Sequence, residues 1–257
     1  MSEPELLYDV KDTIGWITIN RESRRNALSP EMIDLFLGFL DTAEADDNVR
    51  VICLTAAGEK VFCSGVDLVG SMGEGGIVAE AQKYATLLKT MAHVSKPLVA
   101  RINGHCLAGG MGLMLSCDMV YAGDGATFGT PEVKVGLFPM MIGALVFRNA
   151  GRKKALEMMY TARTLSAAEA EEMGLITRAV PAENLDRVVH EALSAVADKA
   201  PLAVKLGRQA LAAVEGRTLD EALDYLCEQL VTVAGTEDAM EGIAAFREKR
   251  EPAWKGR

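Results

Sequence analysis

The sequence predicts an α/β protein with a mainly parallel, buried sheet, followed by a helical tail. Short β-branched segments alternate with segments of helical period, and strands joined through helices pair in parallel. The 257 residues are 49% hydrophobic, which is enough apolar material for one large folded domain. Strand signals stop after Arg148, whereas helical patterns continue to the end of the chain. We therefore expect an α/β core over residues 1–150 or longer and a helical region after it.

Four segments have the composition of strands, since each is short, β-branched and bounded by Gly, Asn or Asp. They cover residues 14–20, 49–56, 97–104 and 118–123. Helices are expected between and after them. Ser29 followed by Pro30 is a cap and first-turn signal for a helix with one apolar face. A second helix covers about 77–92 and ends before the Lys96-Pro97 pair.

The remaining helical segments follow residue 148. They lie near 151–160, 166–175, 183–199, 201–215, 218–234 and 236–249. Ser166 and Glu169 have the spacing of a capping box at the start of the second of these segments.

The net charge and the cysteine spacing limit which partners the protein is expected to bind and in which cellular compartment it is expected to reside. A formal charge of −9 repels polyanions, so nucleic acid is a poor candidate for a partner. The five cysteines match neither a Cys-x-x-Cys pair nor a zinc ligand set, and we interpret them as reduced core residues. The N-terminus lacks a signal-peptide layout, and the longest uncharged run, Ile102–Cys117, is too short to span a bilayer. We expect a cytoplasmic protein with no metal site and no membrane association.

A glycine-rich turn, "NGHCLAGGMGLMLSCD" at residues 103–118, joins a predicted strand to a helix. The free N–H groups of a helix N-terminus can hold a negative oxygen, as in an oxyanion hole. The turn lacks the G-x-G-x-x-G register of a dinucleotide site and the lysine of a P-loop. Tight packing of helix against sheet would explain the glycines equally well. A second small-residue turn, "CSGVD" at 63–67, also follows a strand, so two turns can direct two N–H groups at one carbonyl oxygen.

Several motifs together resemble the crotonase superfamily, the enoyl-CoA hydratase and isomerase family. They are "NRESRRNALSPEMI", "VFCSGVDL", the segment from "KPLVARING" to "VGLFP", "ARTLSAAEAEEMGLITRAVP" and "AFREKREPAWKGR", in the family's order and spacing. The resemblance implies a crotonase spiral of ββα units over residues 1–195. It implies a helical C-terminal region, 196–257, used to form a homotrimer and often a hexamer. It also implies acyl-CoA thioester substrates and no separate cofactor, because CoA is part of the substrate.

The resemblance assigns roles to particular residues. The backbone amides of Val66 and Gly109 would form the oxyanion hole. Residues expected to contact the substrate are Ser64, Gly65, Asp67 and Leu68 near the adenine and pantetheine, Arg24 or Arg25 near the CoA phosphates, Phe246 and Lys249 over the nucleotide end, and Gly110, Gly112, Phe138, Met140 and Met141. Each basic residue is equally explained as a solvated surface charge, and the methionines as core filling.

One catalytic carboxylate of the family's hydratases is missing. Those hydratases place two glutamates over the substrate, and here the second is present as Glu132 while the first falls on Gly112. If Phe128, Leu137, Phe138, Met140 and Met141 desolvate Glu132, its pKa rises and it can move a proton from one carbon to another. Isomerases of the superfamily similarly use a single acid. The sequence therefore favours double-bond isomerisation by Glu132, with hydration retained as a possibility.

Two other functions remain open. A non-catalytic acyl-CoA-binding subunit would keep the amide hole and have lost half of the proton chemistry. RNA binding, known in an unusual branch of the family, is disfavoured by the charge of −9. His105 follows the glycine turn, and we expect a structural or peripheral role for it.

Overall fold

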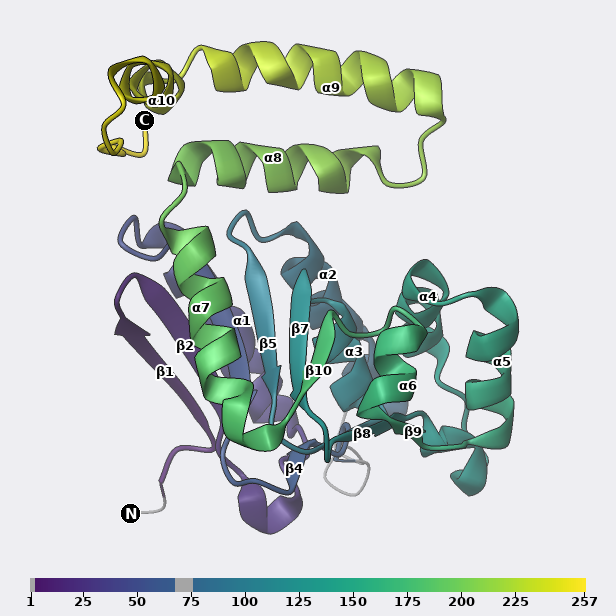
Figure 1. The fold of residues 1–257 in the computed structure, drawn as a ribbon. Coiled ribbons are helices and arrows are strands. Elements are labelled where there is room, and N and C mark those ends of the chain that lie inside the picture. The colour runs from purple at the N-terminus through teal and green to yellow at the C-terminus, as the bar shows by residue number, and fades with distance from the viewer. Residues whose placement is uncertain (1–2, 68–75) are drawn as a thin grey trace.

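The computed structural model describes residues 3–67 and 76–257, in which helices cover two β-sheets (Figure 1). Within these residues the larger sheet has the strand order β1 (Leu6–Lys11), β2 (Ile14–Ile19), β3 (Val51–Ala56), β5 (Leu98–Ile102), β7 (Met119–Gly123) and β10 (Arg178–Val180). The smaller sheet has the order β4 (Val61–Cys63), β6 (His105–Leu107), β8 (Thr127–Gly129) and β9 (Leu165–Ser166). The pairs β1–β2 and β8–β9 are antiparallel, and the other pairs are parallel.

Helices make up most of the remaining described chain. The α-helices are α1 (Pro30–Ala45), α2 (Gly76–His93), α3 (Gly109–Leu115), α4 (Met140–Asn149), α5 (Arg152–Thr161), α6 (Ala167–Glu172), α7 (Leu185–Ala197), α8 (Pro201–Val214), α9 (Leu219–Ala234) and α10 (Glu237–Glu248). Short 3-10 helices are η1 (Glu22–Arg24), η2 (Pro131–Val135) and η3 (Ala182–Asn184).

Three successive ββα units form the centre of the molecule. They are β3-β4-α2, β5-β6-α3 and β7-β8-α4, with η2 before the last helix. In each unit the first strand joins the larger sheet and the second strand joins the smaller sheet. The predicted spiral of ββα units and the mainly parallel sheet are therefore confirmed. The four predicted strands are β2, β3, β5 and β7, neighbours in the larger sheet.

The prediction that strands stop after Arg148 is wrong. β9 and β10 both follow that residue, and β10 extends the larger sheet by pairing in parallel with β7. Strands of two or three residues are too short to show an alternating pattern, and their pairing depends on partners distant in the chain. For the same reason β4, β6 and β8 were not predicted as separate strands.

Capping residues in the sequence correctly predicted where α1 and α6 begin. The Ser29 hydroxyl accepts a hydrogen bond from the Met32 amide at 3.3 Å and caps α1. At the start of α6, Ser166 and Glu169 form the predicted capping box. In both cases the bond partners are three residues apart, so the pattern does not depend on the rest of the fold.

The central strands of the larger sheet are buried on both faces, whereas most residues of the edge strand β1 are exposed. The main core packs one face against α1, α2 and α3, and a smaller core packs the other face against α7 (Figure 1). Burial on both faces explains why β3, with the sequence "VICLTA", is apolar at every position except Thr55 and is buried at every residue.

The C-terminal helices form a separate layer. Figure 1 shows α8 and α9 lying across one end of the molecule, with α9 farther from the sheets. Arg208 on α8 anchors the layer through Asp118, at 2.8 Å. No residue of α9 is buried in the described chain, so Cys227 is exposed, contrary to the prediction that all five cysteines lie in the core. The division into a core over 1–195 and a helical C-terminal region over 196–257 stays a prediction.

No helix of the described residues combines the length and the apolar character needed to cross a membrane.

Candidate active site

Three loops meet at one edge of the smaller sheet. β4, β6 and β8 are neighbours and run in parallel, so their carboxyl ends lie at the same edge. The turn 64–67 follows β4, the start of α3 follows β6, and η2 follows β8. The sheet thus brings Val66, Gly109 and Glu132 to one place, although they are far apart in the chain.

The turns that carry Val66 and Gly109 touch. A Cβ built on Gly109 would lie 3.1 Å from the Val66 nitrogen, and a Cβ built on Gly65 would lie 2.8 Å from the Ala108 Cβ. Because a Cβ lies about 2.5 Å from the nitrogen of its own residue, the two amide nitrogens are at most about 5.6 Å apart. Two donors that each bind one oxygen at about 2.9 Å have nitrogens less than about 5.8 Å apart. The spacing therefore permits both amides to bind one oxygen.

Both amides are left without a protein acceptor. Leu28 pairs with the strand-like turn around Val66 by donating to the Gly65 oxygen and accepting from the Asp67 amide, each at 2.8 Å. This pairing turns the Val66 N–H away from Leu28. Gly109 is the first residue of α3, where N–H groups have no acceptor within the helix. Within the described residues neither N–H donates a hydrogen bond to a protein group.

The start of α3 is strained and tightly packed. Ala108 has φ 47° and ψ −125°, a conformation that disfavours a side chain and costs about 1–3 kcal/mol. Its amide donates to the Gly129 oxygen at 3.0 Å, which ties this turn to β8. A Cβ on Gly110 would lie 2.5 Å from the Cys63 oxygen, so only glycine fits there. The close approach at Gly110 places α3 against β4, and the surrounding contacts keep Ala108 in its strained conformation.

Asn26 joins the loop before α1 to β4 and was not predicted from the sequence. The side chain is fully buried, and its amide nitrogen donates to the oxygens of Ala57 at 3.1 Å and Val61 at 2.7 Å. Its oxygen accepts from the Arg21 amide at 2.9 Å. Asn26 therefore fixes the loop before α1 against the β3–β4 connection. A polar residue between "SRR" and the apolar "AL" was the available signal.

The predicted basic residues lie beside the same turn. Arg24 and Arg25 are exposed, and the Arg25 oxygen accepts from the Ser64 amide at 3.2 Å. The Asp67 carboxylate forms an ion pair with Arg21 at 3.1 Å. This part of the site thus holds an exposed arginine, Arg25, whose backbone is bonded to the Ser64–Asp67 turn.

Glu132 has the features of an acid or base. It lies in the first turn of η2 and is half-buried, and its Oε2 is buried without a partner in the described residues. Burial raises the pKa of Glu132 above its ordinary value, and a hydrogen bond from its own backbone opposes this rise only in part. The neighbouring Thr130 is also buried with an unpaired hydroxyl.

The apolar residues predicted around Glu132 differ in burial. Phe128 is fully buried and Met141 packs against the main core. Leu137 and Phe138 are partly exposed, and Met140 is 73% exposed. Met140 is therefore a surface residue of the single chain rather than core filling.

The Tyr84 hydroxyl occupies the space where a side chain at position 112 would begin. A Cβ on Gly112 would lie 2.1 Å from the Tyr84 hydroxyl oxygen and 3.2 Å from its Cζ. The hydroxyl, which comes from α2, donates to the Gly109 oxygen at 2.5 Å. Burial raises the pKa of Tyr84 well above its usual value, and Glu132 is among the nearby groups that add to the rise. Tyr84 was the sole tyrosine in the predicted helix 77–92, a weak signal for a site residue.

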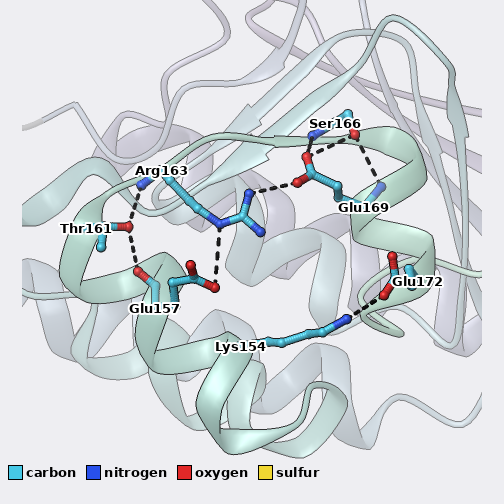
Figure 2. Close-up of polar contacts among 7 residues, drawn as sticks. All are labelled: Lys154, Glu157, Thr161, Arg163, Ser166, Glu169 and Glu172. Carbon is cyan, nitrogen blue, oxygen red and sulfur yellow. Dashed lines mark hydrogen bonds and ion pairs between the residues drawn. The ribbon is translucent and has the colours of Figure 1, made fainter.

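An ion-pair cluster braces the elements behind Glu132. α5 packs against η2 and α4, and Figure 2 shows how α5 is connected to α6. Arg163 binds Glu169 at 2.8 Å, and Lys154 binds Glu172 at 2.6 Å. Arg163 lowers the pKa of Glu169 to about 2, with further help from Ser166. These pairs are exposed, so each adds little stability; they link α5 and the loop after it to α6.

Two predicted substrate contacts, Phe246 and Lys249, are not at this edge. Leu68 lies outside the described residues. Phe246 on α10 is 83% exposed, and Lys249 caps the end of that helix. Figure 1 shows α10 at the opposite end of the molecule from β4 and β8. Within one chain, Phe246 and Lys249 are therefore apart from Val66, Gly109 and Glu132.

Two other potentially reactive side chains near the turns, His105 and Cys63, have no features of catalytic groups. His105 is exposed and shares a 2.7 Å hydrogen bond with the Thr127 hydroxyl, as expected for a structural role. Burial raises the pKa of the Cys63 thiol to about 12, so this thiol stays neutral and is a poor nucleophile. The described residues contain no cluster of three or more His, Cys, Asp or Glu suited to a metal ion.

Comparison with known proteins agrees with this architecture. A family model described as enoyl-CoA hydratase/isomerase matches residues 9–257. The 2,3-dehydroadipyl-CoA hydratase of Escherichia coli is 31% identical over 98% of this chain and 99% of its own. The crystal structure of an enoyl-CoA hydratase from Bacillus anthracis superposes with a TM-score of 0.94 at 32% identity, covering 99% of this chain and all of that one. An enoyl-CoA hydratase from Mycobacterium smegmatis gives 0.94 at 30% identity, over 98% and 99%.

Replacing Gly112 by Ala is expected to lower the free energy of unfolding by about 1–3 kcal/mol. The new methyl group would collide with the buried Tyr84 hydroxyl. Adding Tyr84→Phe removes the oxygen at 2.1 Å and should recover part of this loss, as denaturant unfolding would measure. Gly143→Ala is the control, since its nearest neighbour would be the Met159 sulfur at 3.6 Å. A Gly112→Ala protein as stable as the wild type would contradict the described contact.

Proposed function

Because the chain belongs to the enoyl-CoA hydratase/isomerase family, we propose that it shifts the double bond of an enoyl-CoA thioester through an enolate. One observation carries the proposal: two free amides, of Val66 and Gly109, lie beside one buried, unpaired carboxylate, Glu132. The chemistry needs no group beyond these three and the substrate.

The two amides are the proposed oxyanion hole. When a proton leaves the carbon next to a thioester, negative charge collects on the thioester oxygen. Two fixed N–H donors stabilise that charge more than they stabilise the neutral carbonyl, so they lower the barrier. The strained Ala108 backbone and the Leu28 pairing support this role, because they hold the donors in place before substrate arrives.

Glu132 is the proposed acid and base. Its carboxylate takes a proton from C2 of a 3-enoyl-CoA, and the electrons of that C–H bond form the enolate. The same group returns the proton at C4 as the double bond moves to C2–C3. The product is a 2-enoyl-CoA, no water is consumed, and the carboxylate is regenerated. A raised pKa suits this role, because the protonated form must persist long enough to deliver its proton.

Hydration is the second candidate, because the relatives from Escherichia coli and Bacillus anthracis are named as hydratases. Adding water calls for one group that holds the water and another that protonates carbon. Gly112 supplies no side chain for the first task. For that reason we place isomerisation first.

CoA is proposed to bind along the Ser64–Asp67 turn and Leu68, with its phosphates near Arg25. The exposure of Arg25 and the bond of its backbone to that turn support this placement. Gly110, Gly112, Phe138, Met140 and Met141 remain proposed contacts of the acyl end. Phe246 and Lys249 lie far from these residues in one chain, so a CoA contact from them requires a neighbouring chain.

A homotrimer, or a hexamer made of two trimers, is the proposed assembly. α9 buries no residue in its own chain, and its apolar side chains lie on one face. The exposed apolar residues of α8, α9 and α10 are Leu211, Leu219, Leu223, Leu230, Val231, Met240, Ile243 and Phe246. So much exposed apolar surface is typical of a protein interface.

Glu132→Gln is expected to lower kcat/KM for a 3-enoyl-CoA by about 10²–10⁴-fold, because the amide cannot take a proton. The melting temperature should not fall, since glutamine has no charge to desolvate. The increase in conjugated-thioester absorbance measures turnover. Glu80→Gln is the matched control, because Glu80 also has a buried oxygen without a partner among the described residues.

Three outcomes of this assay would contradict the proposal. Undiminished turnover by the Glu132→Gln variant removes Glu132 from the mechanism. Wild-type hydration of a 2-enoyl-CoA without isomerisation favours the hydratase. Tight binding of CoA esters with no turnover of any thioester favours a non-catalytic binding subunit.

The activity should fall in acid with a midpoint above 4.5, the ordinary pKa of a glutamate. Below its pKa Glu132 is protonated and cannot take the C2 proton, so kcat/KM rises with pH through that pKa. A pH profile of kcat/KM measures the midpoint. A midpoint at or below 4.5 would show that the group responsible is not a desolvated carboxylate.

Replacing both Leu223 and Leu230 by Glu should dissociate the assembly, because charges would be buried without partners at the interface. The two leucines are 56% and 66% exposed in the single chain, so the substitutions should not disturb its fold. Sedimentation velocity measures the mass. Glu228→Gln on the same helix is the control, and an unchanged mass for the double variant would place the interface elsewhere.

A further inference from the structure

The side chain at position 84 and the absence of one at position 112 depend on each other. The Tyr84 hydroxyl lies 2.1 Å from the point where any Cβ at Gly112 would be. Tyr84 is 2% exposed, so its ring is confined by the surrounding core. A glutamate at 112 is therefore excluded as long as Tyr84 keeps its position. The space where the side chain of a second carboxylate would begin is filled by the neutral phenol of Tyr84, which comes from α2.

The phenol is a hydrogen-bond donor and not a base. Its hydroxyl donates to the Gly109 oxygen at 2.5 Å. Burial raises the pKa of Tyr84 well above its usual value, and nearby groups including Glu132 raise it further, so it stays protonated at any working pH. The bond fixes the carbonyl of the same residue whose N–H faces the site. Gly109 has no side chain to restrict its backbone, so this bond restricts its orientation.

We propose that Tyr84 is a positioning residue that selects the reaction, because its phenol holds the Gly109 turn and fills the space where a water-binding carboxylate would lie. This inference rests on the proposed enoyl-CoA chemistry. With that space filled, no water is held opposite Glu132, and the proton that Glu132 removes returns to carbon. With the space open, water can add its hydroxyl to C3 of the 2-enoyl-CoA and a proton to C2.

Tyr84→Phe is the direct test. It keeps the ring and removes the hydroxyl, which frees the Gly109 oxygen to bind a water molecule. We expect kcat for isomerisation to fall about tenfold, with KM changed less than kcat because the CoA contacts are untouched. We also expect the ratio of 3-hydroxyacyl-CoA to 2-enoyl-CoA product to rise about tenfold. Chromatography of the CoA esters measures this ratio.

A changed product ratio distinguishes selection from general damage. Tyr121→Phe is the matched control, because Tyr121 is also buried and its hydroxyl contacts only the Met119 sulfur, at 3.8 Å, among the described residues. It should leave the ratio at the wild-type value. Gly112→Glu combined with Tyr84→Leu opens space for the second carboxylate and should raise hydration further. Gly112→Glu alone should unfold at a lower temperature than the double variant.

The outcomes separate the two proposals. If the wild type isomerises 3-enoyl-CoA and Tyr84→Phe has the same product ratio as the wild type and the Tyr121→Phe control, this inference is wrong and the proposed function stands. If the wild type hydrates 2-enoyl-CoA efficiently with Tyr84 present and does not isomerise, both are wrong. A higher hydration ratio in Tyr84→Phe supports both.

Discussion

The parallel pairing of three very short strands is the constraint on which the candidate site depends. β4, β6 and β8 have three residues each, and their loops contribute Val66, Gly109 and Glu132. Parallel pairing places the three loops at one edge, and the hydrogen bonds between strands leave little freedom to move one loop past another. The larger sheet contributes indirectly, because each of its strands β3, β5 and β7 delivers one strand of the smaller sheet.

Close packing, more than backbone flexibility, explains the glycines of the second turn. Gly110 faces the Cys63 oxygen, and Gly112 faces the Tyr84 hydroxyl, both at distances that exclude a Cβ. The same contacts explain why the turn carries no charged residue: the space beside it is filled by backbone and by a buried phenol. The sequence left two explanations for these glycines: close packing of helix against sheet, or presentation of free amides. The observed contacts are compatible with both.

Particular elements show why part of the fold could be predicted. β3 was found because five of its six residues are apolar and all six are buried. The starts of α1 and α6 were found because Ser29 and Ser166 bind amides three residues away. β10 was missed because three residues show no period and its partner β7 lies more than fifty residues earlier. Interactions between residues three or four apart could therefore be predicted from the sequence, whereas pairing between strands distant in the chain could not.

The sequence by itself determined the chemical groups: a glutamate at 132, glycines at 109 and 112, and the two turns that resemble the enoyl-CoA hydratase and isomerase family. Only the tertiary structure decided what surrounds them. Tyr84 reaches the carbonyl of Gly109, 25 residues away, and Asn26 binds the oxygen of Val61, 35 residues away. Residue types and spacings record which groups a chain carries, but the neighbours of a buried side chain depend on how helices and sheets pack. For that reason the contact between Gly112 and Tyr84 became visible only in the folded molecule.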